Sequence, residues 1–187
     1  MSSPERPSRR VALKGLGALA FVTATGTRWL TPAQARAAIV PYTVLTPAEV
    51  ATLEALGETL MPGATRAGIA HFVDHQLAQP PADALLMLRY LDVPPPYAAF
   101  YQPGLAALDA HATRTHGHAF VALTPARQAA LVPTFAFAQP PGWQGPPSPL
   151  LYLAVRADAV DVVHGTHDGL ERLGLPTMEH ILPERDW

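Results

Sequence analysis

Residues 45–63 read LTPAEVATLEALGETLMPG and carry a complete set of helix signals. Thr46 can cap the helix, Pro47 suits the first helical position, and Glu49 completes a capping box. The apolar residues that follow recur at helical spacing, at Val50, Leu53, Leu56 and Leu60. The sequence Met61-Pro62-Gly63 then ends the pattern. This stretch therefore predicts one amphipathic helix with defined ends.

Similar helical patterns, separated by prolines, continue along the chain after residue 63. We predict further helices over about residues 67–79, 82–91, 97–115, 124–137 and 150–163. Pro133 should kink or end the fourth of these early, and residues 139–149 should form a proline-rich loop. Residues 38–45 should be an extended lead-in, and the tail from residue 165 should be irregular with one helical turn near 168–173. No sustained polar–apolar alternation indicates a strand. The sequence predicts an all-α fold, an irregular bundle of about six short helices with proline-rich loops.

The composition fits one folded domain and removes several chemistries. Of the 187 residues, 49% are hydrophobic and 15% are charged, a balance typical of a globule with a sizeable core. The 21 prolines account for the short elements. The chain has no cysteine, which excludes disulfides, thiol nucleophiles, iron–sulfur ligation and haem attachment through C-x-x-C-H.

Charge is distributed unevenly along the chain. Residues 1–37 hold six of the 13 basic residues and one of the 15 acidic ones, so the remainder has 7 basic and 14 acidic residues, a net charge of −7. The only lysine is Lys14. An acidic body without a basic stripe argues against binding nucleic acid or anionic lipid by charge.

The N-terminus has the order of features of a twin-arginine export signal. The pair Arg9-Arg10 is followed by Leu13 and Lys14, and then by a modestly apolar run over residues 15–26 that is too short to span a bilayer. Small-x-small cleavage sites follow, at 33–35 and at Ala35-Arg36-Ala37, and we favour cleavage after Ala37.

We therefore predict that residues 1–37 are a signal peptide read by the twin-arginine translocase, which carries folded cargo. Residues 38–187 then form the helical domain, and the protein is periplasmic. The alternative is a basic, apolar N-terminal helix that packs on another surface.

Histidines offer the main candidate metal site. His71 and His75 stand at i and i+4 with Asp74 between them, a spacing that can present two imidazoles to one ion. The pattern lacks the glutamate of the zinc protease motifs, and we favour the simpler explanation, an exposed helix face beside the apolar one.

The other polar groups have simple structural explanations. A histidine near a helix C-terminus is favoured by the helix dipole, and a polar turn needs no ligand. These explanations cover His111, His116 and His118 at the end of the helix over 97–115, and His164 and His167 around Gly165. Asp158 and Asp161 are three apart on a helix, which suggests a solvated face. Glycine-rich phosphate loops, dinucleotide fingerprints and G-x-S-x-G elbows are absent from the sequence, so no catalytic set emerges.

Three stretches carry a family resemblance. They are LTPAE at 45–49 with LEAL at 53–56 and LMP at 60–62; GIAHFVDHQL at 68–77, continuing to Leu108-Asp109 and FVALTP at 120–125; and HGT at 164–166 with G-x-x-RLGLP at 169–176. In this order they resemble the gluconate 2-dehydrogenase subunit 3 family, over most of residues 45–183.

The resemblance implies a non-catalytic small subunit of a periplasmic dehydrogenase that oxidises sugars, sugar acids or polyols. The large subunit of such a complex resembles glucose–methanol–choline flavoproteins and holds FAD. A multihaem cytochrome c often takes the electrons and can place the complex at the membrane. The small subunit is expected to supply the export signal and to help the flavoprotein mature. The chain itself then holds no cofactor.

Apolar residues without a predicted element to cover them suggest where a large subunit binds. Trp143 lies in the proline-rich loop, and aromatic anchors are favoured at interfaces. The tail adds Leu175, Met178, Ile181, Leu182 and Trp187. We expect these residues to contact the partner, the alternative being that the tail folds back over its own core.

Two other functions stay open from sequence alone. One is an autonomous periplasmic metalloenzyme that uses His71, His75 and other histidines. The other is a free-standing helical binding protein without an enzyme partner.

Overall fold

The computed structural model describes residues 19–23 and 26–175 of the chain. The described residues are mostly helical, which confirms the predicted all-α class. The elements follow in the order β1 (Leu19–Thr23), β2 (Gly26–Leu30), α2 (Pro32–Ala37), α3 (Pro47–Leu60), α4 (Ala64–Ala67), α5 (Ile69–Leu77), α6 (Met87–Tyr90), α7 (Ala98–His116), the 3-10 turn η1 (Phe120–Ala122), α8 (Pro125–Ala136), α9 (Ser148–His164) and α10 (His167–Arg172).

Helix α3 begins at the predicted capping box. The Thr46 hydroxyl accepts a hydrogen bond from the Glu49 backbone nitrogen at 3.3 Å, and the Thr46 nitrogen donates to Glu49 Oε2 at 2.7 Å. Pro47 occupies the first turn as expected, and Met61 ends the helix. Thr124 caps α8 in the same way through the Arg127 nitrogen. Local signals therefore set these helix starts.

Two predicted helices are shorter or divided in the structure. The segment predicted at 67–79 is split into α4 and α5 by Gly68, whose φ of 85° lies in the left-handed region. The segment predicted at 82–91 is helical only over Met87–Tyr90. Conversely, α8 continues through Pro133 to Ala136. Leu131 and Phe135 are buried on either side of Pro133, and that burial offsets the cost of a proline inside the helix.

A two-stranded hairpin precedes the helices, and its strands were not predicted. β1 pairs antiparallel with β2, with Leu19 opposite Leu30 and Phe21 opposite Arg28. Phe21 and Leu30 are buried, whereas Arg28 and Trp29 are exposed. The segment is too short to give a clear alternating pattern, and β1 lies within the apolar run that fits the export signal.

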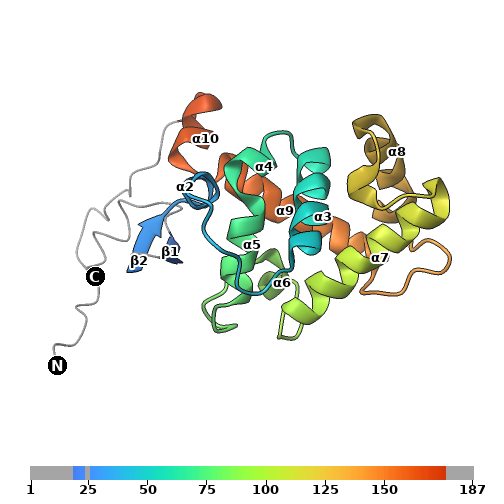
Figure 1. Cartoon of the computed structure of the whole chain (residues 1–187), viewed down its shortest axis with the longest axis horizontal. Coiled ribbons are helices and arrows are strands. Elements are labelled where there is room, and N and C mark those ends of the chain that lie inside the picture. Colours follow the sequence, from blue (N-terminus) through green and yellow to red (C-terminus); the bar gives the residue numbers. More distant parts are fainter. Residues whose placement is uncertain (1–18, 24–25, 176–187) are drawn as a thin grey trace, which may run out of the picture.

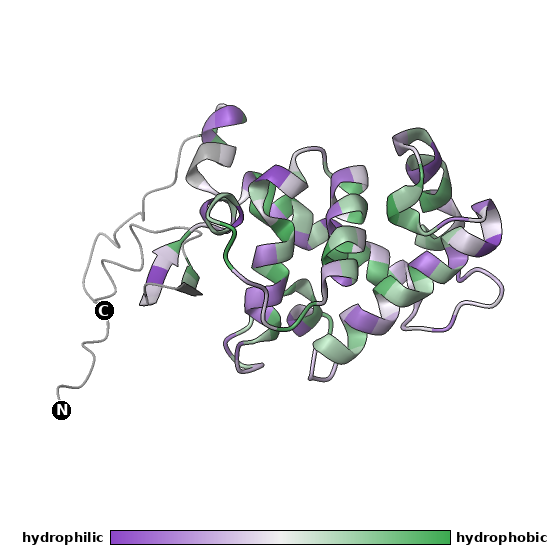
Figure 2. Ribbon diagram, in the orientation of Figure 1, coloured by the Kyte–Doolittle hydropathy of each residue, from purple (hydrophilic) through white to green (hydrophobic). Residues whose placement is uncertain are grey.

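Helix α9 lies at the centre of the bundle and contacts α3, α4, α5, α6, α7, α8 and α10. Figure 1 shows α7 and α8 at one end of the bundle, and α2 with the hairpin at the other, beside α5. Hydrophobic residues line the inner faces of the helices (Figure 2). A second, smaller cluster lies under the hairpin and is formed by Phe21, Leu30, Ala35 and Val40.

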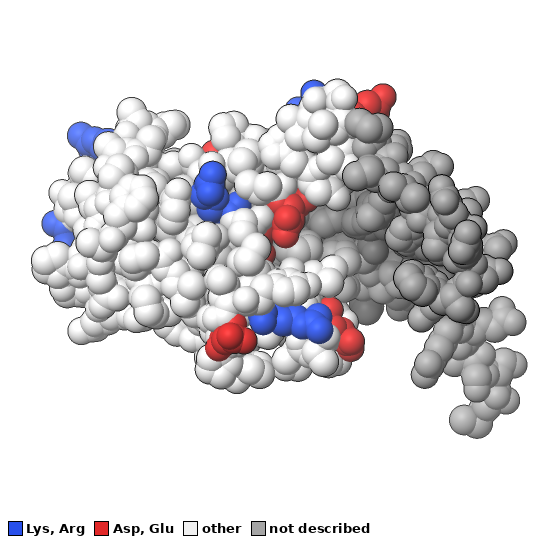
Figure 3. Space-filling view, turned by 180° about the vertical axis from the view of Figure 1, so that it is seen from behind, with Lys and Arg blue, Asp and Glu red and all other residues white. Residues whose placement is uncertain are grey.

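The surface carries few charged side chains. Figure 3 shows them scattered as small mixed groups on one face, with uncharged residues between them. Among the described helices, none combines the length and the apolar character needed to cross a membrane.

Candidate functional site

Asp74 of α5 holds the segment that leads into α3. Its Oδ1 accepts hydrogen bonds from the backbone nitrogens of Val44 and Leu45, both at 2.8 Å. Its Oδ2 accepts from the nitrogen and the hydroxyl of Thr43, at 2.9 and 3.1 Å. Asp74 is buried, so the expectation of an exposed helix face is wrong here. Four donors satisfy this carboxylate, and its role is to anchor the chain.

His71 is also buried and uses both ring nitrogens inside the chain. Nε2 lies 3.1 Å from the Val40 carbonyl oxygen, so Nε2 carries the proton and donates. Nδ1 then accepts from the Tyr42 hydroxyl at 3.2 Å. Burial lowers the pKa of His71 and raises that of Tyr42 to about 12. The neutral imidazole therefore ties α5 to residues 40–42.

His75 faces the hairpin one helical turn further along α5. Its Nε2 lies 3.0 Å from the Ala20 carbonyl oxygen, and its ring packs against Phe21 with centroids 4.9 Å apart. Nδ1 is buried without a hydrogen-bond partner among the described residues. Burial lowers the pKa of His75, so the neutral form is favoured.

Because of these contacts, His71 and His75 do not offer two free ring nitrogens to one metal ion, as the candidate metal site would need. Both nitrogens of His71 are bound within the chain, and one nitrogen of His75 is bound to Ala20. Within the described part of the chain, no group of three or more His, Cys, Asp or Glu side chains is arranged to hold an ion.

Gln76 and Asp109 also bind backbone groups of the chain. Gln76 Oε1 accepts from the Leu85 nitrogen at 2.8 Å, which fixes the loop after α5. Asp109 of α7 accepts from the Thr52 hydroxyl and from the Phe120 nitrogen, both at 2.9 Å. It thus joins α7 to α3 and to η1.

Asp158 of α9 is buried, which corrects the expectation of a solvated face. Its Oδ2 accepts a hydrogen bond from the Tyr101 hydroxyl of α7, and its Oδ1 accepts from the Met87 nitrogen of α6 at 3.1 Å. Burial raises the pKa of Asp158 to about 7. Nearby Asp161 is exposed, as predicted.

The histidines at the end of α7 differ in environment. His111 is buried, with Nε2 2.7 Å from the Thr134 hydroxyl of α8. Burial lowers its pKa. His116 is the last residue of α7 and His118 is exposed, which fits the expected helix-end position.

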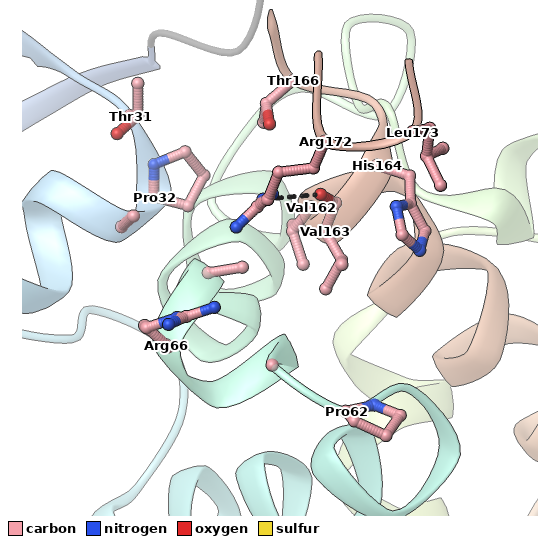
Figure 4. A pocket seen from close by; sticks show the side chains of 13 residues that line it. Thr31, Pro32, Pro62, Arg66, Val162, Val163, His164, Thr166, Arg172 and Leu173 are labelled. Carbon is pink, nitrogen blue, oxygen red and sulfur yellow. Dashed lines mark hydrogen bonds between the residues drawn. The ribbon is translucent and has the colours of Figure 1, made fainter. Parts of the chain in front are cut away.

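A pocket of about 540 Å³ lies between α2, α4, α9 and α10 (Figure 4). Arg66 of α4 and Arg172 of α10 line it, and Arg172 Nη2 also donates to the Val163 carbonyl oxygen at 3.3 Å. His164 lines it as well, with Nδ1 buried and without a partner among the described residues. The two guanidinium groups make the pocket suited to an anion. Thr31 and Pro32 form one wall, so the pocket belongs to the full chain and not to the predicted 38–187 domain alone.

The family model of gluconate 2-dehydrogenase subunit 3 matches residues 47–166, more than half of the chain. The chain belongs to the gluconate 2-dehydrogenase subunit 3 family. This confirms the resemblance drawn from the sequence motifs. The search of curated proteins and the search of solved structures found no match.

The match makes the chain one subunit of a dehydrogenase complex, which implies further subunits. The matched region contains α3 to α9, and with them the polar residues described above that bind backbone groups. In this member of the subunit 3 family, the histidine–aspartate segment of α5 is therefore a structural element.

Trp143, a residue of the expected interface, is buried in the isolated subunit. Its side chain is only 7% exposed and stacks on Phe135 of α8 with ring centroids 6.1 Å apart. Its Nε1 donates to the Pro146 carbonyl oxygen at 2.7 Å. The proline-rich loop folds back on the subunit's own core, and this geometry satisfies the indole N–H.

The tail residues of the expected interface are described only at their start. Leu175 is exposed. Met178, Ile181, Leu182 and Trp187 lie outside the described residues, as do Arg9, Arg10, Leu13 and Lys14 of the predicted export signal. For these residues the predictions stand as made.

The predicted cleavage region is folded onto the body of the subunit. Ala35 is fully buried, and Ala37 is the last residue of α2. The described residues before the predicted domain boundary at 38 thus include regular elements, β1, β2 and α2.

Sequence reasoning missed the Tyr101–Asp158 pair and the two arginines of the pocket. A usable signal existed for Asp158, because apolar residues surround it on its helix, at Ala154, Val155, Ala159 and Val162. Arg66 and Arg172 are far apart in the chain, and only the tertiary fold brings them together.

Proposed function

We propose that this chain is the non-catalytic small subunit of an exported, flavin-dependent dehydrogenase of sugars, sugar acids or polyols. Its N-terminal segment supplies the twin-arginine signal for the complex, and its body helps the FAD-bearing large subunit to mature. The complex then works in the periplasm, where it can be held at the membrane through its partners.

One observation carries this proposal. The two candidate ligands from the sequence, His71 and His75, each bind a backbone carbonyl oxygen of the chain, at Val40 and Ala20. Asp74 between them accepts hydrogen bonds from residues 43–45. Groups held in this way position the chain and are not free to act on a substrate. Together with the family membership and the Arg9-Arg10 pair, this favours a supporting role.

We assign FAD to the large subunit, a glucose–methanol–choline-type flavoprotein. A dinucleotide pyrophosphate is commonly held at the turn of a βαβ unit, and the described strands of this chain are only two antiparallel neighbours. A multihaem cytochrome c would accept the electrons as a third subunit.

Co-expression with a large subunit that lacks its own signal tests the proposal. In the Arg9→Lys/Arg10→Lys variant, both proteins should stay in the cytoplasm, because the translocase recognises the arginine pair and not positive charge alone. The matched control is Arg28→Lys, an exposed arginine outside the pair. Export of both proteins despite the double substitution would overturn the assignment of the signal.

Metal analysis of the purified chain separates the proposal from a metalloenzyme. The subunit alone should bind no stoichiometric zinc or iron and should oxidise no sugar or alcohol. One equivalent of metal that is lost in a His71→Ala/His75→Ala variant would favour the metalloenzyme instead.

A further inference from the structure

The hairpin is attached to the body through α5. The His75 Nε2 donates to the Ala20 carbonyl oxygen at 3.0 Å, and the Phe21 ring lies 4.9 Å from the His75 ring and 6.3 Å from the His71 ring between centroids. Phe21 is buried as a result. A backbone hydrogen bond and an aromatic side chain therefore fix β1 on the helix.

Helix α2 is attached next to it by a different set of contacts. Ala35 is fully buried, and Arg36 Nε donates to Glu54 Oε1 of α3 at 3.1 Å. Gly68 lets the two backbones meet, because a Cβ at this position would lie 2.3 Å from the carbonyl carbon and oxygen of Pro32. Close backbone contact and an ion pair thus hold α2 on the junction of α4 and α5.

The cluster under this segment is separate from the main core. Phe21, Leu30, Ala35 and Val40 form their own group, and three of the four lie within residues 19–37. A unit with its own small cluster can detach as one piece at lower free energy than global unfolding.

We propose that Glu54, Gly68, His71 and His75 form a binding surface for the chain's own export leader, residues 19–37. This inference rests on the proposed function, which makes residues 1–37 the export signal. The bound leader is a closed state of the precursor, in which Phe21 and Ala35, the second of which lies two residues before the favoured cleavage point, are buried against the body. The leader must leave the surface before the signal is used and cleaved.

The backbone around the cleavage site shows why release must come first. The Ala35 nitrogen donates to the Thr31 carbonyl oxygen at 2.8 Å, and the Val40 nitrogen donates to the Ala35 carbonyl oxygen at 3.0 Å. Proteolysis favours exposed chain without such bonds, and a buried, helical Ala35 does not offer it. Docking therefore protects the precursor until the leader is withdrawn.

Limited trypsinolysis of the purified full-length precursor tests the surface. The bonds after Arg28 and Arg36 report on the leader, and the bond after Arg127 reports on the body. Phe21→Ala and His75→Ala should each raise cleavage at Arg28 and Arg36 by about tenfold or more, because cleavage tracks the population of the released state. Cleavage at Arg127 should not change.

The controls match each residue type at a position away from the leader. Phe137→Ala and His118→Ala replace an exposed phenylalanine and an exposed histidine, and should leave all three cleavage rates unchanged.

The ion pair gives a further test of the surface. Glu54→Gln removes the charge that pairs with Arg36 and should raise cleavage at Arg36. If trypsin cut the wild-type leader as fast as the leader of the variants, the proposed binding surface would be contradicted.

The readout keeps this inference separate from the proposed function. Trypsin protection is measured on purified protein and does not depend on export. If the leader is protected from trypsin but export survives Arg9→Lys/Arg10→Lys, the export role is rejected and the binding surface stands. If the leader is not protected but export needs the arginine pair, only the binding surface is rejected.

Discussion

The hydroxyl of Tyr101 on α7 donates a hydrogen bond to the carboxylate of Asp158 on α9, and neither side chain is exposed. The same carboxylate accepts from the Met87 nitrogen, so one acid joins three helices at the centre of the bundle. Burial raises the pKa of both groups, that of Asp158 to about 7 and that of Tyr101 well above 10.

Tyr101→Phe should destabilise the fold although it keeps the ring. The change leaves one oxygen of a buried acid without its donor, at a cost of about 1–3 kcal/mol in the free energy of unfolding. Urea unfolding followed by circular dichroism measures the effect. Tyr152→Phe, at a half-buried position on α9, is the matched control and should change little. Equal stabilities for the two variants would contradict the role assigned to the pair.

Asp158 should also make the stability depend on pH. Its pKa is raised from 3.8 to about 7 on folding, so the folded state binds the extra proton between these values. The contribution of Asp158 to the free energy of unfolding is therefore fully present below pH 3.8, and it is lost as the pH rises through about 7. Asp158→Asn does not titrate, and its stability relative to wild type should improve between pH 5 and pH 8, by at most about 1.4 kcal/mol per pH unit.

Three histidines, His71, His75 and His111, change the stability with pH in the opposite direction. Their effect is the same in variant and wild type, so it cancels in the difference between the two free energies of unfolding at each pH. Burial lowers their pKa values, so the stability that their neutral forms contribute falls as the pH drops below 6.5. Asp83→Asn, at an exposed aspartate, is the control and should show a constant difference from wild type. A constant difference for Asp158→Asn as well would show that the buried carboxyl does not titrate in this range.

The helix starts could be predicted from sequence because their causes are local. Thr46, Pro47 and Glu49 act within one turn, and the structure places all three as predicted. Thr124 caps α8 for the same reason. Local hydrogen bonds of this kind need no knowledge of the rest of the fold.

Burial could not be predicted in the same way. Asp74 looked like part of an exposed helix face, yet it is buried because residues 43–45 pass over α5. Asp158 looked solvated, yet α9 lies at the centre of the bundle and is covered on several sides. The segment around β1 and α2 showed only its apolar content, because its packing depends on Gly68 and His75 much further along the chain.

Asp74→Asn should weaken the attachment of the segment before α3. Asparagine has one acceptor oxygen, so its amide group would face the backbone N–H groups of Thr43, or of Val44 and Leu45. Leaving buried donors unpaired should lower the free energy of unfolding by about 2–3 kcal/mol. Asp83→Asn is again the exposed control and should stay within about 0.5 kcal/mol of wild type.

Hydrogen exchange locates the effect of Asp74→Asn. Faster exchange is expected at the amides of residues 43–45, with little change in α8. Unchanged exchange at these amides would show that other contacts hold the segment.

Trp143→Ala should destabilise the subunit itself. The indole is 7% exposed, stacks on Phe135 and donates to Pro146, so truncation removes core packing and a buried hydrogen bond together. Losses of about 3–5 kcal/mol are typical for a buried tryptophan. Trp29→Ala removes a tryptophan that is 63% exposed on β2, and should change the free energy of unfolding by about 0.5 kcal/mol or less. Trp143→Phe keeps an aromatic ring without the N–H, and its loss of stability should fall between those of the two alanine variants.

The opposite outcome would support an interface at Trp143. In that case Trp143→Ala would leave the stability of the isolated subunit unchanged and would abolish its pull-down with a large flavoprotein subunit. The loop would then have to open in the complex.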